Sequence, residues 1–298
     1  MAGDDDRAGP TVDDTAGTAG NERLAAAGAA AAFEWGLCSD PGDVRPHNED
    51  YAGAFVPGGD EVAWDRGAVF CVADGLGGHA AGEEASRLAV ETLLRSWGDE
   101  SADPPAQALR KGVRAANAAI LDAALHSRRR GMGTTLTALS LAGREALIAH
   151  VGDSRAYLVR DDECLQLTTD HTRVSEMLRM RLITPEQAAH HPARSMLTRS
   201  LGDQLTVQVD LVRQGIDTDD AFVLCSDGLW DIVGRHEMAA VVNAEPRPPL
   251  GEAVQRLVRM AVQRGATDNV TAVAVRVTAA GHIPAAAARR SLFRRGRR

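Results

Sequence analysis

Short apolar runs, separated by small or charged residues, recur through residues 33–278 and constrain the fold more than any other feature. Each run has about the length of a β-strand and is far shorter than the roughly 20 apolar residues of a membrane-spanning helix. We therefore expect strands at 33–38, 51–56, 68–73, 134–141, 146–151, 155–160, 205–212, 221–225 and 270–277.

Stretches with helical periodicity lie between some of these runs. The segments 82–97, 105–125 and 250–262 place apolar residues three and four positions apart, which is typical of a helix with one buried face. The short loops between neighbouring strands favour antiparallel pairing. Two packed sheets with the helices outside them would bury all of these apolar faces, so the sequence predicts an α+β sandwich.

The two ends of the chain differ from this body in composition. Residues 1–32 carry six acidic and two basic side chains among Ala, Gly and Thr. Such a segment buries too little apolar area to offset the entropy lost on ordering, so we expect a disordered acidic leader. Residues 24–32 could form a short Ala-rich helix within it. Residues 279–298 are expected to be an Ala/Arg-rich basic tail, since the last ten residues include six arginines.

Charge and composition exclude several classes of protein. A net charge of −8 argues against a nucleic-acid-binding protein, although the arginine tail could bind phosphates unspecifically. The acidic first residues lack the basic and apolar segments of a signal peptide, which together with the short apolar runs predicts a cytoplasmic protein without a membrane span. The four cysteines show no C-x-x-C pair and no zinc spacing.

Aspartates at the ends of predicted strands are the candidate functional groups. Asp50 and Asp268 precede strands, whereas Asp74, Asp153 and Asp227 follow them. An aspartate in such a place is usually a turn residue, but these five would converge if the strand ends share one edge of the sandwich. Carboxylate oxygens suit Mg²⁺ or Mn²⁺. Two such ions about 3.5–4 Å apart can hold a bridging hydroxide for attack on a phosphoryl group.

Eight short segments hold most of these aspartates together with Gly, Thr and His residues. They are Arg45-Pro-His-Asn-Glu-Asp50, Val72-Ala-Asp-Gly-Leu-Gly-Gly-His79, Gly131-Met-Gly-Thr-Thr135, His150-Val-Gly-Asp-Ser-Arg-Ala-Tyr157, Leu167-Thr-Thr-Asp-His171, Leu197-Thr-Arg-Ser-Leu-Gly202, Cys225-Ser-Asp-Gly-Leu-Trp230 and Thr267-Asp-Asn-Val-Thr271. In this order they resemble the motifs of the protein phosphatase 2C (PP2C, or PPM) family of bacterial type. The resemblance covers roughly 36–277. It implies a four-layer α-β-β-α sandwich of two mainly antiparallel sheets flanked by helices, and a metal-dependent phosphatase that acts on phosphoserine and phosphothreonine in proteins.

The same resemblance implies a set of ligands for two tightly bound Mn²⁺ or Mg²⁺ ions. One carboxylate would bridge both ions with the help of a neighbouring carbonyl, two carboxylates would hold one ion, and two more would hold the other, partly through water. In that order, the ligands are Asp74 and the carbonyl of Gly75, then Asp227 and Asp268, then Glu49 and Asp50.

Three further residues receive roles from the resemblance. Arg45 would bind the substrate phosphate, because a guanidinium fork matches phosphate oxygens. His79 would be the general acid that protonates the departing serine or threonine oxygen. Asp153 would hold a third, weaker metal ion.

The chain departs from the family pattern at one visible position. Bacterial relatives usually have a glycine two residues before the Ile-Thr pair at 183–184, where this chain has Arg181. The segment resembles the flap beside the active site, so the resemblance leaves this flap's contacts with substrate open. We expect His171 to be a loop or capping residue and Trp230 to be part of the core.

The main alternative is a catalytically silent, PP2C-like binding module. Such a module is expected to lose metal carboxylates, and all five aspartates are present. The sequence contains neither the P-loop motif nor the C-x₅-R motif of a cysteine phosphatase. The expected partners are phosphorylated proteins, including a Ser/Thr kinase and its substrates, with no nucleic acid. We expect a monomer.

Overall fold

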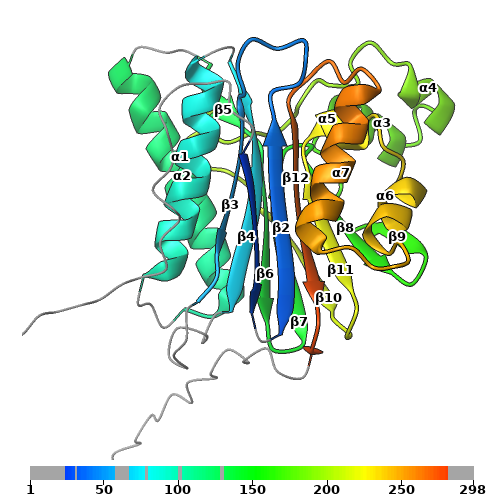
Figure 1. Ribbon diagram of the computed structural model, residues 1–298. Helices are drawn as coiled ribbons and strands as arrows, with labels where there is room; N and C mark the ends of the chain where they lie inside the picture. Colours follow the sequence, from blue (N-terminus) through cyan, green and yellow to red (C-terminus); the bar gives the residue numbers. More distant parts are fainter. Residues whose placement is uncertain are drawn as a thin grey trace, which may run out of the picture.

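Two antiparallel sheets lie face to face, and helices cover both outer faces of the pair (Figure 1). This architecture comes from a computed structural model that describes residues 24–30, 32–57, 67–77, 80–99, 103–127 and 131–280. The expected α+β sandwich is confirmed.

The first sheet carries the N-terminal strand at one edge and places the C-terminal strand near its centre. Every neighbouring pair of its described strands is antiparallel. Its order is β1 (Leu24–Ala30), β2 (Phe33–Asp40), β12 (Val270–Val277), β11 (Ala221–Cys225), β8 (Arg155–Arg160) and β9 (Glu163–Gln166).

The second sheet is also antiparallel throughout its described strands. Its order is β10 (Asp210–Gly215), β7 (Glu145–Val151), β6 (Leu136–Ala142), β4 (Ala68–Leu76) and β3 (Asp50–Phe55), and the short β5 (Gly133–Thr134) pairs with the end of β4.

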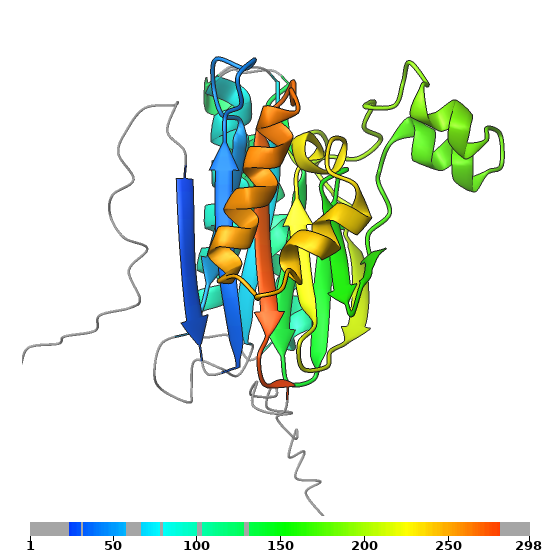
Figure 2. The same ribbon diagram turned by 45° about the vertical axis from the view of Figure 1, so that its right-hand side comes forward.

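Helices pack on each sheet, and one helical segment stands away from both. The second sheet is covered by α1 (Ala80–Gly98) and α2 (Pro105–Ser127), and the first by α6 (Arg235–Val242) and α7 (Leu250–Gln263). The short α5 (Asp227–Trp230) follows β11. Figure 2 shows α3 (Arg173–Arg179) and α4 (Pro185–Ala189) projecting from the sandwich. We call residues 173–196 the flap.

Three apolar layers hold the sandwich together, one between the sheets and one under each helical layer. Strand β4 shows how the sequence builds them. Phe70 and Val72 face the layer between the sheets, whereas Val69 and Cys71 face α1 and α2. Because both faces of such a strand are buried, it appears in the sequence as an unbroken apolar run.

The N-terminal boundary predicted from the sequence is wrong. Leu24–Ala30 is not a helix but strand β1, which pairs with β2 from Leu24↔Ser39 to Ala30↔Phe33. The open edge of β2 supplies hydrogen-bond partners that outweigh the helical preference of alanine. Residues 1–23, the rest of the expected leader, lie outside the described residues. At the other end Ala280 is buried, so the body extends past 278.

The predicted strand at 205–212 is also displaced. Strand β10 begins at Asp210, and Leu205 is 90% exposed. The Asn117 side-chain amide on α2 donates to the carbonyl of Gln204 and holds this stretch as a loop. In the described part of the chain, every helix is too short or too polar to cross a bilayer.

Candidate active site

The five predicted aspartates gather at one end of the sandwich. Asp50 and Asp74 are direct partners across the β3–β4 pair, and Asp153 follows β7 of the same sheet. Asp227 is the first residue of α5 after β11, and Asp268 lies just before β12, both from the other sheet. In an antiparallel sheet the end of one strand lies beside the start of its neighbour. The convergence expected from the sequence therefore occurs.

The cluster is electrostatically unfavourable for its own carboxylates. Burial raises the pKa of Asp74 well above its usual value, and the charges of the other four aspartates raise it further. Burial likewise raises the pKa values of Asp50 and Asp227, with further contributions from Asp268. The pKa of Asp153 rises to about 7, mainly through burial. Buried carboxylates in such a cluster repel one another, and a bound cation would offset this repulsion.

Arg45 reaches the cluster from its exposed rim. Its Nη2 donates to Oδ2 of Asp268 over 2.6 Å, and the two side chains are 49% and 38% exposed. The hydrogen bond to Asp268 raises the pKa of Arg45, so the guanidinium stays charged. The deeper aspartates remain without this partner.

Ser226, which follows β11 in the other sheet, supports Asp50. The sequence did not suggest this role. Its hydroxyl donates to Oδ2 of Asp50 over 2.7 Å and accepts from the backbone N–H of Thr271 over 3.0 Å. Ser226 precedes Asp227 in the chain, so one residue links two predicted metal ligands. Its place inside the Cys225-Ser-Asp segment was the available signal.

Asn269 fixes the loop that carries Arg45 and Glu49. Its Oδ1 accepts from the backbone N–H of Glu49 over 2.8 Å, and its Nδ2 donates to the carbonyls of Pro41 and His47. Asn269 is buried and directly follows Asp268. It therefore ties the loop between β2 and β3 to the start of β12. Sequence reasoning missed this role, although Asn269 lies within a recognised segment.

Gly75 is required by close backbone contacts. A Cβ at this position would lie 2.3 Å from the carbonyl oxygen of Gly82 and 2.5 Å from that of Glu49. The N–H of Gly75 donates to the same Glu49 carbonyl, and the Asp74 N–H donates to Oγ1 of Thr135. These contacts set the backbone that presents Asp74. The Glu49 carboxylate lies beside Gly82, in the first turn of α1.

The backbone at Asp153 is held by two residues whose roles the sequence underestimated. Nδ1 of His171 accepts from the N–H of Gly152, whose φ of 110° suits glycine, and the His171 N–H donates back to the Gly152 carbonyl. Nε1 of Trp230 donates to the carbonyl of Asp153. The Arg155 guanidinium lies 3.4 Å from the centre of the Trp230 ring.

The carboxylate oxygens of the cluster suit a hard divalent cation, although their side chains are not yet oriented around one common point. Among the described residues, no three His, Cys, Asp or Glu side chains are arranged to hold an ion as they stand. Protein donors instead occupy Asp268 and Asp50. Asp227 differs, because its Oδ1 is buried and has no hydrogen-bond partner. A buried, unpaired carboxylate oxygen among other carboxylates fits Mg²⁺ or Mn²⁺.

One predicted residue cannot be placed. His79, the expected general acid, lies outside the described residues, between the end of β4 and the start of α1. Arg45, Glu49, Asp50, Asp74, Gly75, Asp153, Asp227 and Asp268 all lie at the same end of the sandwich.

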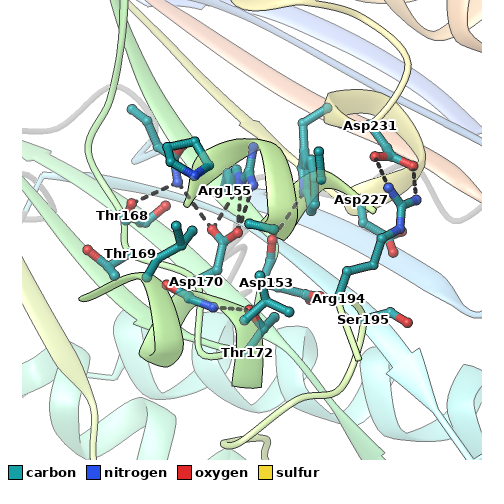
Figure 3. A pocket seen from close by; sticks show the side chains of 18 residues that line it. Asp153, Arg155, Thr168, Thr169, Asp170, Thr172, Arg194, Ser195, Asp227 and Asp231 are labelled. Carbon is teal, nitrogen blue, oxygen red and sulfur yellow. Dashed lines mark hydrogen bonds and ion pairs between the residues drawn. The ribbon is translucent and has the colours of Figure 1, made fainter. Parts of the chain in front are cut away.

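A pocket of about 460 Å³ opens beside the aspartates and is roofed by the flap (Figure 3). Asp153 and Asp227 form part of its wall. The rest of the lining comes from the β9–α3 region, from α3 and α4 of the flap, and from α5.

The comparisons with known proteins agree with this site. The family model "Protein phosphatase 2C" matches residues 59–270, so the chain belongs to the PP2C family. It is 38% identical over 242 residues to the serine/threonine phosphatase stp of Listeria innocua, covering 80% of this chain and 93% of that protein. It is 40% identical over 238 residues to the serine/threonine protein phosphatase PstP of Mycobacterium tuberculosis, covering 79% of this chain but only 43% of that longer protein.

Solved structures show the same fold. The catalytic domain of PstP in complex with 2 manganese ions superposes with a TM-score of 0.71 at 35% identity, covering 83% of this chain and 99% of that one. The comparisons thus confirm the family and the fold that the motifs indicated. They also confirm the class, a protein serine/threonine phosphatase.

Proposed function

We propose that this protein removes phosphate from phosphoserine and phosphothreonine in proteins, using two Mn²⁺ or Mg²⁺ ions at the aspartate cluster. The observation that carries the proposal is the cluster itself. Burial and the charges of neighbouring aspartates raise the pKa values of Asp50, Asp74, Asp153 and Asp227, and one Asp227 oxygen has no partner. When bound, such ions supply a hydroxide nucleophile and polarise the phosphoryl oxygens.

The proposed ligands come from the resemblance to the PP2C motifs, and their gathering at one end of the sandwich supports them. Asp74, with the carbonyl of Gly75, would contact both ions, and the charges of the other four aspartates do reach Asp74. Asp227 and Asp268 would hold one ion, and Glu49 and Asp50 the other, partly through water. Asp153 would hold a third, weaker ion, since few protein ligands compete there with water.

Arg45 would bind the substrate phosphate. The guanidinium already donates a hydrogen bond to the Asp268 carboxylate at the rim of the cluster. A phosphate offers the same paired oxygens with more charge. Metal binding by Asp268 would free Arg45 for this contact. His79 would protonate the leaving serine or threonine oxygen, a step that matters because an alkoxide is a poor leaving group.

The expected partners are phosphorylated proteins, among them a Ser/Thr kinase and its substrates, in the cytoplasm and with the enzyme as a monomer. A catalytically silent binding module would bind phosphoproteins without turning them over. The presence of all five aspartates, each held by its own backbone contacts, favours the enzyme over this alternative.

The test is phosphate release from a phosphothreonine peptide and from its phosphotyrosine counterpart. The full chain should hydrolyse the phosphothreonine peptide with Mn²⁺ far faster than the phosphotyrosine peptide. It should stop in EDTA and recover when Mn²⁺ is restored. Full activity in chelator would overturn the proposed mechanism, and binding of the phosphopeptide without any turnover would support the silent module.

A further inference from the structure

The pocket under the flap is continuous with the candidate active site. Asp153 and Asp227 belong to its wall, so whatever occupies the pocket lies next to the reacting phosphate. Figure 3 shows these two aspartates on the body side, with Arg194 and Ser195 of the flap nearby. A volume of about 460 Å³ lies within the roughly 300–1,000 Å³ of ordinary ligand sites.

The charged side chains of the pocket, apart from these two aspartates, are paired with one another. Arg155 donates from Nε and Nη2 to both carboxylate oxygens of Asp170, over 2.9 and 2.7 Å, and both side chains are largely buried. Arg194 likewise donates from both Nη atoms to the two oxygens of Asp231. Apart from Asp153 and Asp227, which belong to the candidate metal cluster, the pocket therefore has no unpaired charge available to recognise a charged ligand.

One wall of the pocket, formed by the two flap helices, is mainly apolar. It consists of Val174 and Leu178 of α3 together with Pro185, Ala188 and Ala189 of α4, while Ser175, Arg194 and Ser195 add the polar groups of the flap. A charged side chain placed against this wall would lose water without gaining a partner, whereas an apolar one would gain from burial.

Few interactions fix the position of the flap, which carries this wall, relative to the body. The flap leaves the body at a narrow neck, where Thr172 and Leu197 form an antiparallel bridge. Apart from the helix-cap hydrogen bonds to Thr172 at the neck, the Arg194–Asp231 pair is the one hydrogen-bonded or ion-pair connection between residues 174–195 and the body among the described residues. Asp231 caps the C-terminus of α5, the helix that begins with Asp227. The roof is thus fixed to the same short helix that carries a predicted metal ligand.

The flap also carries exposed large apolar side chains. Three of the seven large apolar side chains that are exposed in the described chain lie on it, namely Met180, Leu182 and Met196. Single exposed apolar residues are ordinary, but a concentration on one short segment beside an active site suits contact with a protein substrate.

We propose that this pocket is a subsite for the side chain of a residue adjacent to the phosphorylated serine or threonine, and that it selects an apolar side chain. The inference rests on the proposed function. Consecutive Cα atoms are about 3.8 Å apart, so a neighbour of the phosphoresidue necessarily lies close to the wall formed by Asp153 and Asp227. The subsite thereby defines a substrate class: phosphoproteins with an apolar residue beside the phosphate.

The test compares phosphothreonine peptides that differ at one flanking position, with Leu, Ser, Glu or Lys placed on either side of the phosphothreonine. The wild-type protein should favour Leu on one side by roughly tenfold in kcat/KM over Ser, a size typical of a small apolar pocket. Turnover of p-nitrophenyl phosphate, which has no flanking residue, serves as the internal reference for the metal centre.

Two flap variants then localise the preference. Ala189→Trp fills the pocket from an exposed position on α4, so the preference for Leu should collapse and the ratio of peptide to p-nitrophenyl phosphate activity should fall about tenfold. Ala193→Trp makes the same change on the flap but outside the lining, and should retain both the preference and the ratio. Circular dichroism checks that each variant is folded.

Three results would overturn the subsite: equal rates for the Leu and Ser peptides, a preference for Glu or Lys, or an undiminished Leu preference in Ala189→Trp. Failure of the proposed function would look different, because p-nitrophenyl phosphate would then not be turned over in Mn²⁺. In that case fluorescence anisotropy still tests the subsite, since the Leu peptide should bind the wild-type protein more tightly than the Ser peptide.

Discussion

The aspartate end of the sandwich and the flap lie side by side, but they are held in opposite ways. Asp50, Asp74 and Asp153 are held by hydrogen bonds with Ser226, Thr135 and Trp230, and Asn269 holds the backbone of the neighbouring Glu49. The flap has a narrow neck, and the Arg194–Asp231 pair links its far part to the body of the described structure.

This difference separates two tasks. Chemistry on a phosphoryl group requires ligands placed within a fraction of an ångström, which a rigid set of strand ends provides. Recognition of varied phosphoproteins tolerates a more loosely held wall. Segments with few contacts to the body open at lower free energy than a core does. We expect substitutions at the aspartate end to change turnover strongly and substitutions in the flap to change selectivity.

The largest effect is expected at Asp74. Asp74→Asn should lower kcat by about 10³-fold, because the carboxylate proposed to contact both ions loses its charge. The same change should stabilise the metal-free protein at neutral pH by several degrees in Tm. A carboxyl whose pKa is raised in the folded state makes stability fall as pH rises through the range from its unfolded to its folded pKa, and asparagine removes that cost.

Thermal unfolding in EDTA over a range of pH values checks this prediction. The difference in Tm between the variant and the wild type should grow from acidic to neutral pH. A metal-free Asp74→Asn protein that is less stable than the wild type at every pH would show that the buried Asp74 carboxylate does not destabilise the folded protein.

A smaller effect is expected at the exposed rim. Arg45→Ala would remove the proposed charge-assisted contact with phosphate, worth about 1.5–3 kcal/mol, so kcat/KM should fall roughly ten- to a hundredfold. Stability should hardly change, since an exposed ion pair such as Arg45–Asp268 contributes at most about 1 kcal/mol. Steady-state kinetics with unchanged kcat and KM would show that Arg45 does not contact substrate.

The smallest effect sharpens the contrast, because it concerns the flap alone. Arg181 has a φ of 57° at the end of α3, where its N–H donates to Leu178 and that of Leu182 to Met177. This helix ending favours glycine. Arg181→Gly should relieve about 1 kcal/mol. Since the flap is loosely attached, the gain should appear as roughly fivefold slower amide exchange at the end of α3, with the global Tm unchanged.

Hydrogen exchange read by mass spectrometry separates the alternatives. Slower exchange confined to the end of α3 supports the account. A rise in global Tm of several degrees would mean that the flap unfolds together with the sandwich, and the proposed division between the two regions would then be wrong.

The sequence predicted the strands and the cluster of aspartates better than the side chains that hold the cluster in place. Apolar runs mark strands buried on both faces, and an aspartate at the end of each points to one shared edge. The hydrogen bonds of Asn269 and Ser226 could not be predicted in this way, because Glu49 and Asn269 are 220 positions apart and Asp50 and Ser226 are 176 apart. Side-chain partners at such separations depend on the folded register.

One error and one open question have local causes. The Ala-rich stretch 24–30 has no apolar period, so nothing in its sequence indicates that β2 has an open edge for it to join. The unusual Arg181 was visible in the sequence, but only the backbone shows that it occupies a left-handed position where a glycine would be relaxed.

Calorimetric titration of the metal-free protein with Mn²⁺ tests the central claim most directly, which is that the aspartate cluster binds divalent ions. Two tight sites are expected. The binding enthalpy should also change between buffers of different ionisation enthalpy, because carboxyls with raised pKa values release protons when an ion binds. Asp227→Asn should lose at least one of the sites. Absence of tight binding, or tight binding that Asp227→Asn leaves intact, would contradict it.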